Sequence, residues 1–335
     1  MRFLFVLLLL ISCLENSIAQ QHSFFPSKIW LDTDGNPINA HGGGVTFHEG
    51  MYYLYGEIKK GKTWLVPDQE WECYRVPAGG ISCYSSKDLI NWKYEGVALS
   101  TTVGDFSSDI DTSKVVERPK VLFNKKTGKF VMWMHIDERT YSYAHAGVAV
   151  SDSPAGPFNY LGSVKPNGND SRDMTLFQDS DGKAYHIYAS EKNMTMRICQ
   201  LSDDYLTHTK NETRMLIGQH REAPSMFKNN GNYYLITSGC TGWSPNAPLL
   251  SVSNHPLGNW QELGNPCIGE GAENTFLSQS TFVVPFPGNK NAYIFMADRW
   301  NKEDLEKSSY IWLPLQLKNG KPEIKWHNKW NFDEY

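Results

Sequence analysis

The sequence predicts an all-β protein that folds as a five-bladed β-propeller. One kind of strand–turn–strand segment recurs five times along the chain, and its turns have the composition of hairpin turns. No stretch shows a sustained helical period of apolar residues, which argues against an α/β fold. A sandwich of two sheets is the alternative fold for a chain with this pattern.

Each copy of the segment has an apolar strand, a polar turn that usually contains glycine, and a second strand rich in aromatic and β-branched residues. These are the features of a β-hairpin. The five copies lie at 44–55, 121–134, 175–188, 225–236 and 281–296. They are spaced as the blades of a propeller are, with a long insertion in the first blade at about 59–78.

A weaker hairpin follows each copy, and together the two hairpins supply the four strands of a blade. We expect the paired strands of this second hairpin at 81–84 and 89–92, 147–151 and 156–158, 198–201 and 205–206, 250–252 and 258–260, and 310–313 and 324–326. The chain from 24 to 335 is therefore predicted to form a single propeller, which is its catalytic domain.

Residues 1–19 have the pattern of a secretory signal peptide. A positive start at Arg2 precedes an apolar run at 3–11, and small residues come before Gln20. This predicts a secreted or periplasmic protein with no transmembrane segment, because the run is too short to cross a bilayer. Residues 10–13 also match a lipoprotein processing box, so a lipid on Cys13 is the alternative.

Charge and cysteine content narrow the possible partners. The net charge is −4 and no basic tract occurs, which excludes nucleic acid as a partner. The six cysteines are scattered and form neither a disulfide framework nor a zinc pattern, although Cys73 and Cys83 are close enough in sequence to pair. We expect a monomer that requires no cofactor, and the sequence neither indicates nor excludes a structural calcium.

Acidic residues occur at nearly the same register before the first strand of three blades: Glu117, Asp173 and Glu222. Gln279 has the corresponding place in blade five. Because the innermost strands of a propeller line its channel, these side chains are expected to converge on one pocket. Converging carboxylates suit the cleavage of glycosidic bonds, since one must stay protonated and a neighbouring charge raises its pKa.

The blade starts resemble glycoside hydrolase family 43 over nearly all of the chain after residue 19, and most closely its exo-β-1,3-galactanases. The motifs that carry the resemblance are Tyr55-Gly56-Glu57, Glu117-Arg118-Pro119-Lys120, Met134-His135-Ile136-Asp137, Ser171-Arg172-Asp173-Met174, Arg221-Glu222-Ala223-Pro224, Thr241-Gly242-Trp243 and Ser278-Gln279-Ser280-Thr281. The resemblance implies an inverting hydrolase that acts from the end of a polysaccharide or oligosaccharide chain.

Residue roles follow from the same resemblance. Glu222 matches the general acid, and Asp173 matches the residue that orients it and tunes its pKa. The usual base, an aspartate at the start of blade one, is missing from 39–43, and the galactan-degrading subgroup shares that absence. Gln279 is then the candidate for positioning or activating water through its imidic acid form. Glu117 is the candidate for binding the terminal galactose, or an alternative base.

The same resemblance implies that four further residues line the subsite for the terminal sugar: Glu57, Tyr141, Thr241 and Trp243. The leading hypothesis is an enzyme that releases galactose from galactan or arabinogalactan side chains. An α-L-arabinofuranosidase or β-xylosidase of the same family is the second hypothesis. The third, motivated by the missing carboxylate, is a non-catalytic sugar-binding propeller.

Overall fold

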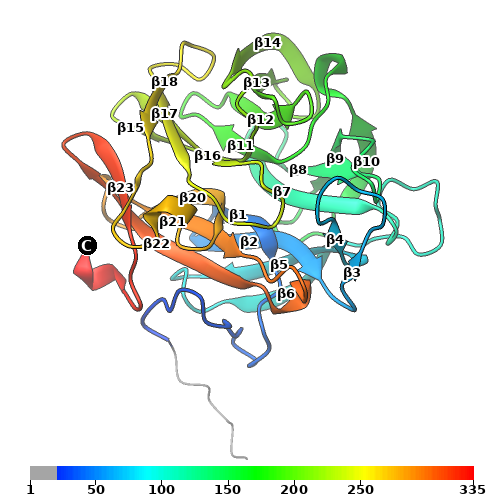
Figure 1. Cartoon of the computed structure of the whole chain (residues 1–335), viewed down its shortest axis with the longest axis horizontal. Helices are drawn as coiled ribbons and strands as arrows, with labels where there is room; N and C mark the ends of the chain where they lie inside the picture. The colour runs from blue at the N-terminus through cyan, green and yellow to red at the C-terminus, as the bar shows by residue number, and fades with distance from the viewer. Residues whose placement is uncertain (1–20) are drawn as a thin grey trace, which may run out of the picture.

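The computed structural model describes residues 21–335, and the predicted five-bladed propeller is confirmed. Five antiparallel sheets follow one another around a central axis (Figure 1). Their strands are, in blade one, β1 (His41–His48), β2 (Met51–Lys59), β5 (Ala78–Ser86) and β6 (Lys93–Leu99); in blade two, β7 (Val115–Asn124), β8 (Lys129–Asp137), β9 (His145–Ser151) and β10 (Asn159–Val164); in blade three, β11 (Met174–Gln178), β12 (Ala184–Ser190), β13 (Thr195–Leu201) and β14 (His208–Met215); in blade four, β15 (Arg221–Asn229), β16 (Asn232–Gly239), β17 (Leu249–Ser253) and β18 (Gln261–Gly264); and in blade five, β20 (Gln279–Pro285), β21 (Ala292–Arg299), β22 (Ser309–Lys318) and β23 (Lys321–Lys325).

A few elements lie outside this four-strand pattern. β19 (Cys267–Ile268) pairs in parallel with β23 and gives blade five a fifth strand. The predicted insertion in blade one contains a small hairpin of β3 (Trp64–Leu65) and β4 (Tyr74–Arg75). The 3-10 turns are η1 (Pro166–Gly168), η2 (Ala272–Asn274), η3 (Leu305–Lys307) and η4 (Phe332–Glu334).

The outermost strands of blades one to four begin later than the sequence predicted. Residues expected in them form the preceding turns instead, and β6, β10, β14 and β18 start just beyond. Leu89 and Tyr205 are buried and have left-handed backbone angles, with φ of 65° and 66°. Trp92 is buried too, and its indole N–H donates to the carbonyl of Leu89 at 3.0 Å. These apolar side chains anchor turns against the core. Because buried apolar residues are also typical of strands, the sequence pattern predicted strands at these turns.

Cys73 and Cys83, which are close enough in sequence to pair, form no disulfide, and both thiols are free and buried. The two sulfur atoms lie against different loops of blade two. The Sγ of Cys73 is 3.9 Å from the carbonyl oxygen of Arg139, and the Sγ of Cys83 is 3.9 Å from that of Pro154. The predicted signal peptide and the alternative lipid on Cys13 fall outside the described residues. Between residues 21 and 335, none of the helical segments has the length and apolarity to span a membrane.

The innermost strands share an irregularity at the mouth of the channel. In blades one, two and four the pairing shifts register immediately after His41, Glu117 and Glu222. The residue that follows each of them has a positive φ, 57° at Gly42, 55° at Arg118 and 50° at Ala223. A β-bulge inserts a residue and changes the direction of its neighbours' side chains. In blades two and four the bulge turns the side chains of Glu117 and Glu222 toward the common pocket.

Gly42 shows why one of these positions requires glycine. A Cβ atom at Gly42 would lie 2.1 Å from Oε1 of Glu57, well inside van der Waals contact. The backbone there is left-handed as well, a conformation that glycine adopts at no steric cost. The start of blade one thus leaves room for the Glu57 carboxylate.

Aromatic side chains pack the first and last segments of the described chain against each other and so close the propeller. Phe24 forms an isolated β-bridge with Trp330 and stacks on its indole, with the ring centroids 4.1 Å apart. Trp330 is fully buried, and its indole N–H donates to the carbonyl of Trp312 at 2.8 Å. Trp30 packs edge-on against Trp312. The first and last segments of the described chain are therefore held together mainly by aromatic packing on blade five.

We expect Trp330→Ala to lower the free energy of unfolding by about 3–5 kcal/mol, because it leaves a large cavity where the chain ends meet. Urea denaturation followed by tryptophan fluorescence measures this change. Phe106→Ala, at a side chain that is 72% exposed, is the matched control and should change stability by less than about 0.5 kcal/mol. Equal stability of the two variants would contradict a closing role for Trp330.

Candidate active site

The five innermost strands meet at a pocket of about 800 Å³, and every blade contributes to its wall. The structure brings all eight sequence-predicted site residues to this pocket: Glu57, Glu117, Tyr141, Asp173, Glu222, Thr241, Trp243 and Gln279. Four of them, Glu117, Asp173, Glu222 and Gln279, lie within two residues of the first residue of an innermost strand, as the blade-start argument required. Within residues 21–335 no group of His, Cys, Asp and Glu side chains is arranged to hold a metal ion.

Glu222 lies on β15 beside two amide side chains. Its Oε1 accepts from Nε2 of Gln279 at 2.9 Å, and its Oε2 accepts from Nδ2 of Asn193 at 3.2 Å. The carboxyl keeps partial access to solvent through the pocket but is otherwise surrounded by protein. Burial, and then the negative charge of Asp173, raise its pKa to about 8 despite the nearby Arg118 guanidinium. Glu222 is therefore protonated at neutral pH.

Asp173 is held from two sides just before β11. Its Oδ2 lies 2.9 Å from a guanidinium nitrogen of Arg118 and accepts the backbone N–H of Ala223 at 3.1 Å. The second contact joins Asp173 to the bulge that follows Glu222. Asp173 thus both supplies the charge that raises the pKa of Glu222 and fixes the backbone beside it.

Arg118 is buried in the middle of the channel and connects several blades. Its side chain donates to Oε1 of Gln279 at 2.5 Å and to the carbonyl of Ser280 at 3.0 Å. Its backbone N–H points to a carboxylate oxygen of Glu57 at 3.4 Å. Together with the Asp173 contact, these bonds join blades one, two, three and five around one cation.

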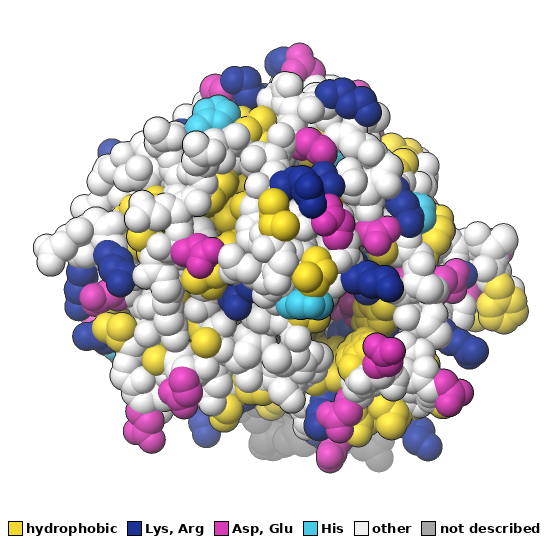
Figure 2. All heavy atoms as spheres, turned by 45° about the horizontal axis from the view of Figure 1, so that its top comes forward, with side chains coloured by type: hydrophobic (Ala, Val, Ile, Leu, Met, Phe, Trp, Pro, Cys, Tyr) yellow, Lys and Arg dark blue, Asp and Glu magenta, His cyan; other side chains and the backbone are white. Residues whose placement is uncertain are grey.

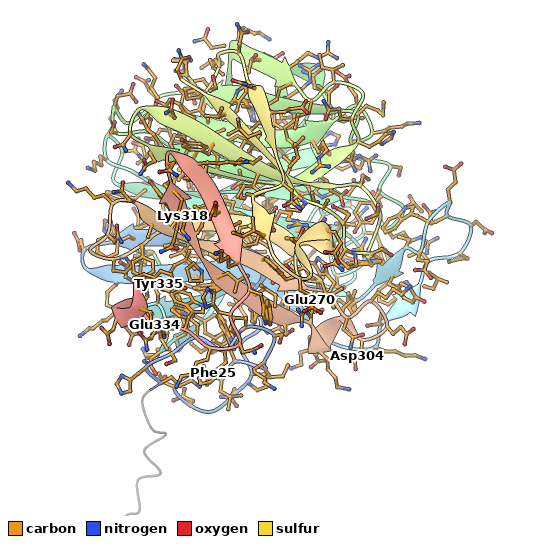
Figure 3. All side chains as sticks on the ribbon, turned by 60° about the vertical axis from the view of Figure 1, so that its left-hand side comes forward. Phe25, Glu270, Asp304, Lys318, Glu334 and Tyr335 are labelled. Atoms are coloured by element: carbon orange, nitrogen blue, oxygen red, sulfur yellow. The ribbon has the colours of Figure 1, made fainter. Side chains whose placement is uncertain are left out.

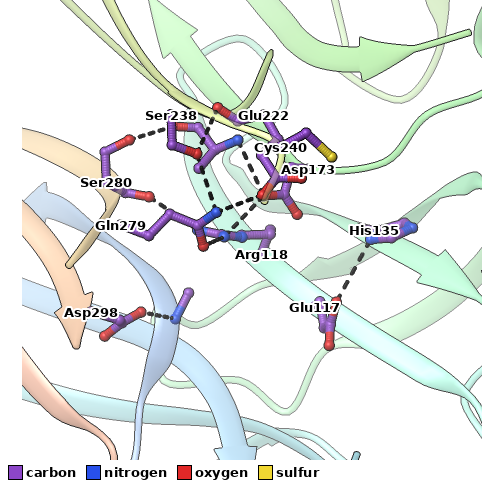
Figure 4. Close-up of polar contacts among 12 residues, drawn as sticks. Glu117, Arg118, His135, Asp173, Glu222, Ser238, Cys240, Gln279, Ser280 and Asp298 are labelled. Carbon is purple, nitrogen blue, oxygen red and sulfur yellow. Dashed lines mark hydrogen bonds and ion pairs between the residues drawn. The ribbon is translucent and has the colours of Figure 1, made fainter. Parts of the chain in front are cut away.

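Gln279 has all four of its amide positions occupied. Its oxygen accepts from Arg118 and, at 3.1 Å, from the indole N–H of Trp300. Its nitrogen donates to Glu222 and, at 3.1 Å, to the hydroxyl of Ser238. Arginine and tryptophan can only donate, so these partners fix which end of the amide is oxygen. Figure 4 shows this cluster around Glu222, with Glu117 well apart from it.

Glu117 belongs to a second, separate cluster at the floor of the pocket. Lys59 reaches it at 3.2 Å and also forms an ion pair of 2.6 Å with Glu57. The hydroxyl of Tyr141 donates to both oxygens of Glu117, at 3.1 and 3.2 Å. Burial would raise the pKa of Glu117, but the charges of Lys59, Arg75 and His135 outweigh it and lower the pKa to about 2. Glu117 is therefore a carboxylate.

Aromatic residues form the upper walls. Trp71, from the blade-one insertion, packs edge-on against Tyr141 with ring centroids 5.5 Å apart. Trp243 packs edge-on against Trp300 with ring centroids 5.3 Å apart. Thr241 lies at the rim, where its hydroxyl donates to the carbonyl of Ser244 at 2.6 Å and so braces its own loop. The pocket is polar below and aromatic above, as expected for a site that binds sugar rings.

The start of blade one does not present a carboxylate to this pocket. His41 occupies the position that corresponds to Glu117 and Glu222, but it is buried and directed toward blade five. Its Nδ1 lies 3.5 Å from Asp298, and its ring stacks on Tyr310 with centroids 4.9 Å apart. Asp298 also accepts the backbone N–H of Gly42 at 2.6 Å. This pair ties the first blade to the last.

Sequence reasoning did not single out several residues that shape the site. Arg118 and His135 stood inside quoted motifs without a role. Lys59 was detectable, because it lies two residues beyond Glu57 on one strand and so on the same face. Asn193, Trp71 and Trp300 had no sequence signal, since loops far apart in the chain bring them to the pocket.

Comparison with known families matches residues 45–279 to glycosyl hydrolases family 43. The chain belongs to this family, and it is a glycoside hydrolase. A β-1,3-galactosidase of the family, solved with galactodeoxynojirimycin, is 43% identical with a TM-score of 0.85 over 92% of this chain and 100% of that one. An exo-β-1,3-galactanase from Phanerochaete chrysosporium, solved with galactose, is 37% identical with a TM-score of 0.83 over 92% of this chain and 68% of that one.

Two further relatives extend the comparison. An exo-β-1,3-galactanase from Clostridium thermocellum is 37% identical, with a TM-score of 0.80, over 92% of this chain and 66% of that one. A curated xylan 1,3-β-xylosidase from a Vibrio species is 31% identical over 118 residues, which are 32% of this chain. That match covers 20% of the Vibrio protein, so the chain spans about a fifth of the curated relative.

We expect Asp173→Asn to lower the pKa of Glu222, because the variant removes the negative charge that helps to raise this pKa while keeping the side chain's size. Titration of glutamate labelled with ¹³C at the carboxyl carbon, with Glu222→Gln to assign the resonance, measures the shift by NMR. Asp203→Asn makes the same charge change at a side chain that is 87% exposed, and should leave the pKa unchanged. An unaltered titration in Asp173→Asn would contradict the coupling.

Proposed function

We propose that this family 43 enzyme is a secreted exo-acting β-1,3-galactanase that releases galactose, with inversion, from galactan or arabinogalactan side chains. The carrying observation is the pairing of Glu222 with the amide of Gln279, while His41 occupies the start of blade one. The β-1,3-galactosidase and exo-β-1,3-galactanase relatives, at 37–43% identity over most of this chain, support the choice of sugar and linkage.

In the proposed mechanism Glu222 is the general acid. It protonates the glycosidic oxygen as the bond to the leaving sugar breaks, which requires a carboxyl that keeps its proton at working pH. The pKa of about 8 meets that requirement. Asp173 sustains the high pKa, and once Glu222 has given up its proton the two carboxylates repel each other, which favours reprotonation.

Glu117 is proposed to bind the terminal galactose rather than to act as the base. Its pKa of about 2 makes it a weak proton acceptor. Lys59 and Tyr141 beside it offer donors, and its own oxygens offer acceptors, so the cluster is suited to sugar hydroxyls. The buried, polar floor formed with Glu57 fits the single terminal sugar that an exo-acting enzyme holds.

Gln279 is proposed to position the attacking water. In the substrate-free geometry its amide oxygen already accepts two hydrogen bonds, from Arg118 and Trp300. In the imidic acid form that oxygen carries a hydrogen of its own, which would point at the hydrogen of one of these two donors and be repelled by it. Water activation at Gln279 therefore requires the substrate to displace at least one of its present partners, whereas positioning by the amide nitrogen needs only the loss of Ser238.

We expect Glu222→Gln to reduce the release of galactose from β-1,3-galactan by at least about 100-fold, because the amide cannot supply the proton. Chromatography of the products, with the anomer followed by NMR, measures both rate and stereochemistry. Asp203→Asn serves as the control and should keep full activity. Full activity in Glu222→Gln, or turnover by wild type on every β-linkage except β-1,3-galactosyl, would refute the proposal.

A comparison of Glu117→Gln with Gln279→Ala separates the two candidates for the water-activating role. If Glu117 binds sugar, Glu117→Gln mainly raises KM, while Gln279→Ala lowers kcat with a smaller change in KM. Steady-state kinetics on a galactan oligosaccharide measures both constants. A collapse of kcat in Glu117→Gln that added azide restores would instead make Glu117 the base.

A β-xylosidase is the second candidate, because the Vibrio relative acts on 1,3-linked xylan. Activity on a panel of β-galactosyl, β-xylosyl and α-L-arabinofuranosyl substrates separates the two.

We also propose that residues 1–19 direct secretion and are removed. Mass spectrometry of the mature N-terminus tests this, and a lipid on Cys13 is the alternative outcome.

A further inference from the structure

Two further hollows continue the catalytic pocket across blade five, one adjoining the pocket and the other adjoining the first hollow. The first, of about 300 Å³, shares Trp243, Gln279 and Trp300 with the pocket, and its other walls include Leu277 and Arg299. The second, of about 920 Å³, begins at Leu277 and Arg299 and extends to Trp326. Because neighbouring hollows share walls, the pocket and the two hollows form one continuous series. We call the two hollows beyond the catalytic pocket the blade-five trough.

The trough starts on the side from which the leaving part of a substrate must depart. Glu222 stands at the blade-four wall, whereas the cluster around Glu117 lies across the pocket in blades one and two. An acid that protonates the leaving oxygen lies next to the leaving group. The remainder of a glycan chain therefore emerges on the Glu222 side, where the blade-four loop that carries Trp243 borders both the pocket and the trough.

The segment between the two hollows has a strained backbone. Thr275, Phe276 and Leu277 all have positive φ, between 55° and 61°, although none is glycine. Such a conformation costs an ordinary residue roughly 1–2 kcal/mol, and runs of it persist only where the surroundings hold them. Here Arg299 donates to the carbonyls of Phe276, at 2.5 Å, and Leu277, at 3.3 Å. The strain keeps Leu277 exposed in the trough, two residues before Gln279.

The lining of the distal hollow fits a neutral, hydroxyl-rich ligand. It offers the half-buried indole of Trp326, the exposed Asn328, and charges of both signs at Glu270 and Lys325. Figure 3 labels Glu270, on the loop between β19 and η2. The face shown in Figure 2 likewise mixes acidic and basic side chains without a field of one sign. Mixed charge beside an aromatic ring favours a sugar chain over an anion or a nucleic acid.

We propose that the blade-five trough is an accessory binding site for the leaving portion of the polysaccharide chain. Leu277 and Trp326 contact that chain, and Arg299 is a positioning residue that holds the strained segment. The proposal rests on the proposed glycan hydrolysis but is independent of which sugar is released. It predicts that long substrates bind better than short ones because of residues remote from Glu222.

The test compares Trp326→Ala and Leu277→Gly on a polymeric and a disaccharide substrate of the same linkage. Glycine suits the positive φ at 277, so that variant removes the side chain without disturbing the loop. Each variant should raise KM for the polymer by roughly tenfold, as expected for the loss of one contact residue. Activity on the disaccharide should stay unchanged. Phe106→Ala, equally a loss of an exposed apolar side chain, is the control.

Binding of the polymer in the Glu222→Gln background, measured by affinity electrophoresis, separates this proposal from the proposed function. If wild type cleaves neither substrate, the proposed function fails, while weaker polymer binding in the two trough variants still supports the trough. Unchanged polymer binding and KM in both variants would overturn it. So would a change in sedimentation behaviour without a change in polymer binding, which would make the trough a contact between copies of the chain.

Discussion

The buried guanidinium of Arg118 is the contact on which the arrangement of the site depends. Its guanidinium donors point in several directions and reach two other blades: Asp173 at the start of blade three, and Gln279 and Ser280 in blade five. A propeller has no continuous core across its axis, so its blades need such cross-links where the innermost strands meet. A planar, permanently charged group can make these bonds at fixed angles, which lysine cannot. The cation also limits the repulsion between Asp173 and Glu222.

Two buried glutamates in one pocket have opposite protonation states because of their neighbours. Burial pushes the pKa of both upward. For Glu222 the charge with the largest influence is that of Asp173, which adds to the upward shift of the pKa. For Glu117 the nearest charge is Lys59, with Arg75 and His135 behind it, and these reverse the effect. A separation of this kind assigns acid and anion roles within a single site. It lets one wall of the pocket donate a proton while the floor holds hydroxyl groups.

Unusual backbone angles surround the acid. The bulges after Glu117 and Glu222 aim these side chains into the channel, and residues 191–193, which include Asn193 beside Glu222, all have positive φ. Residues 275–277 also have positive φ, and they end two residues before Gln279. Local strain of this kind has to be balanced by surrounding contacts. Its concentration around Glu222 indicates that the chain folds against local preference in order to place the groups that contact it.

The sequence by itself determined the fold class, the five blades and the convergence of the four blade-start residues Glu117, Asp173, Glu222 and Gln279 on one pocket. Those features follow from local rules, since hairpin patterning, turn residues and register along each strand are written within a few neighbouring positions. It placed the outer strands too early, because buried turn anchors such as Leu89 and Tyr205 look like strand residues.

Only the tertiary structure decided that Cys73 and Cys83 stay apart, that His41 turns away from the pocket, and that Lys59 and Arg118 set the charges of the two clusters. The same holds for the trough that leads from Glu222 to Trp326. These outcomes depend on contacts between blades far apart in the chain, and burial and charge at such contacts exist only once the ring has closed.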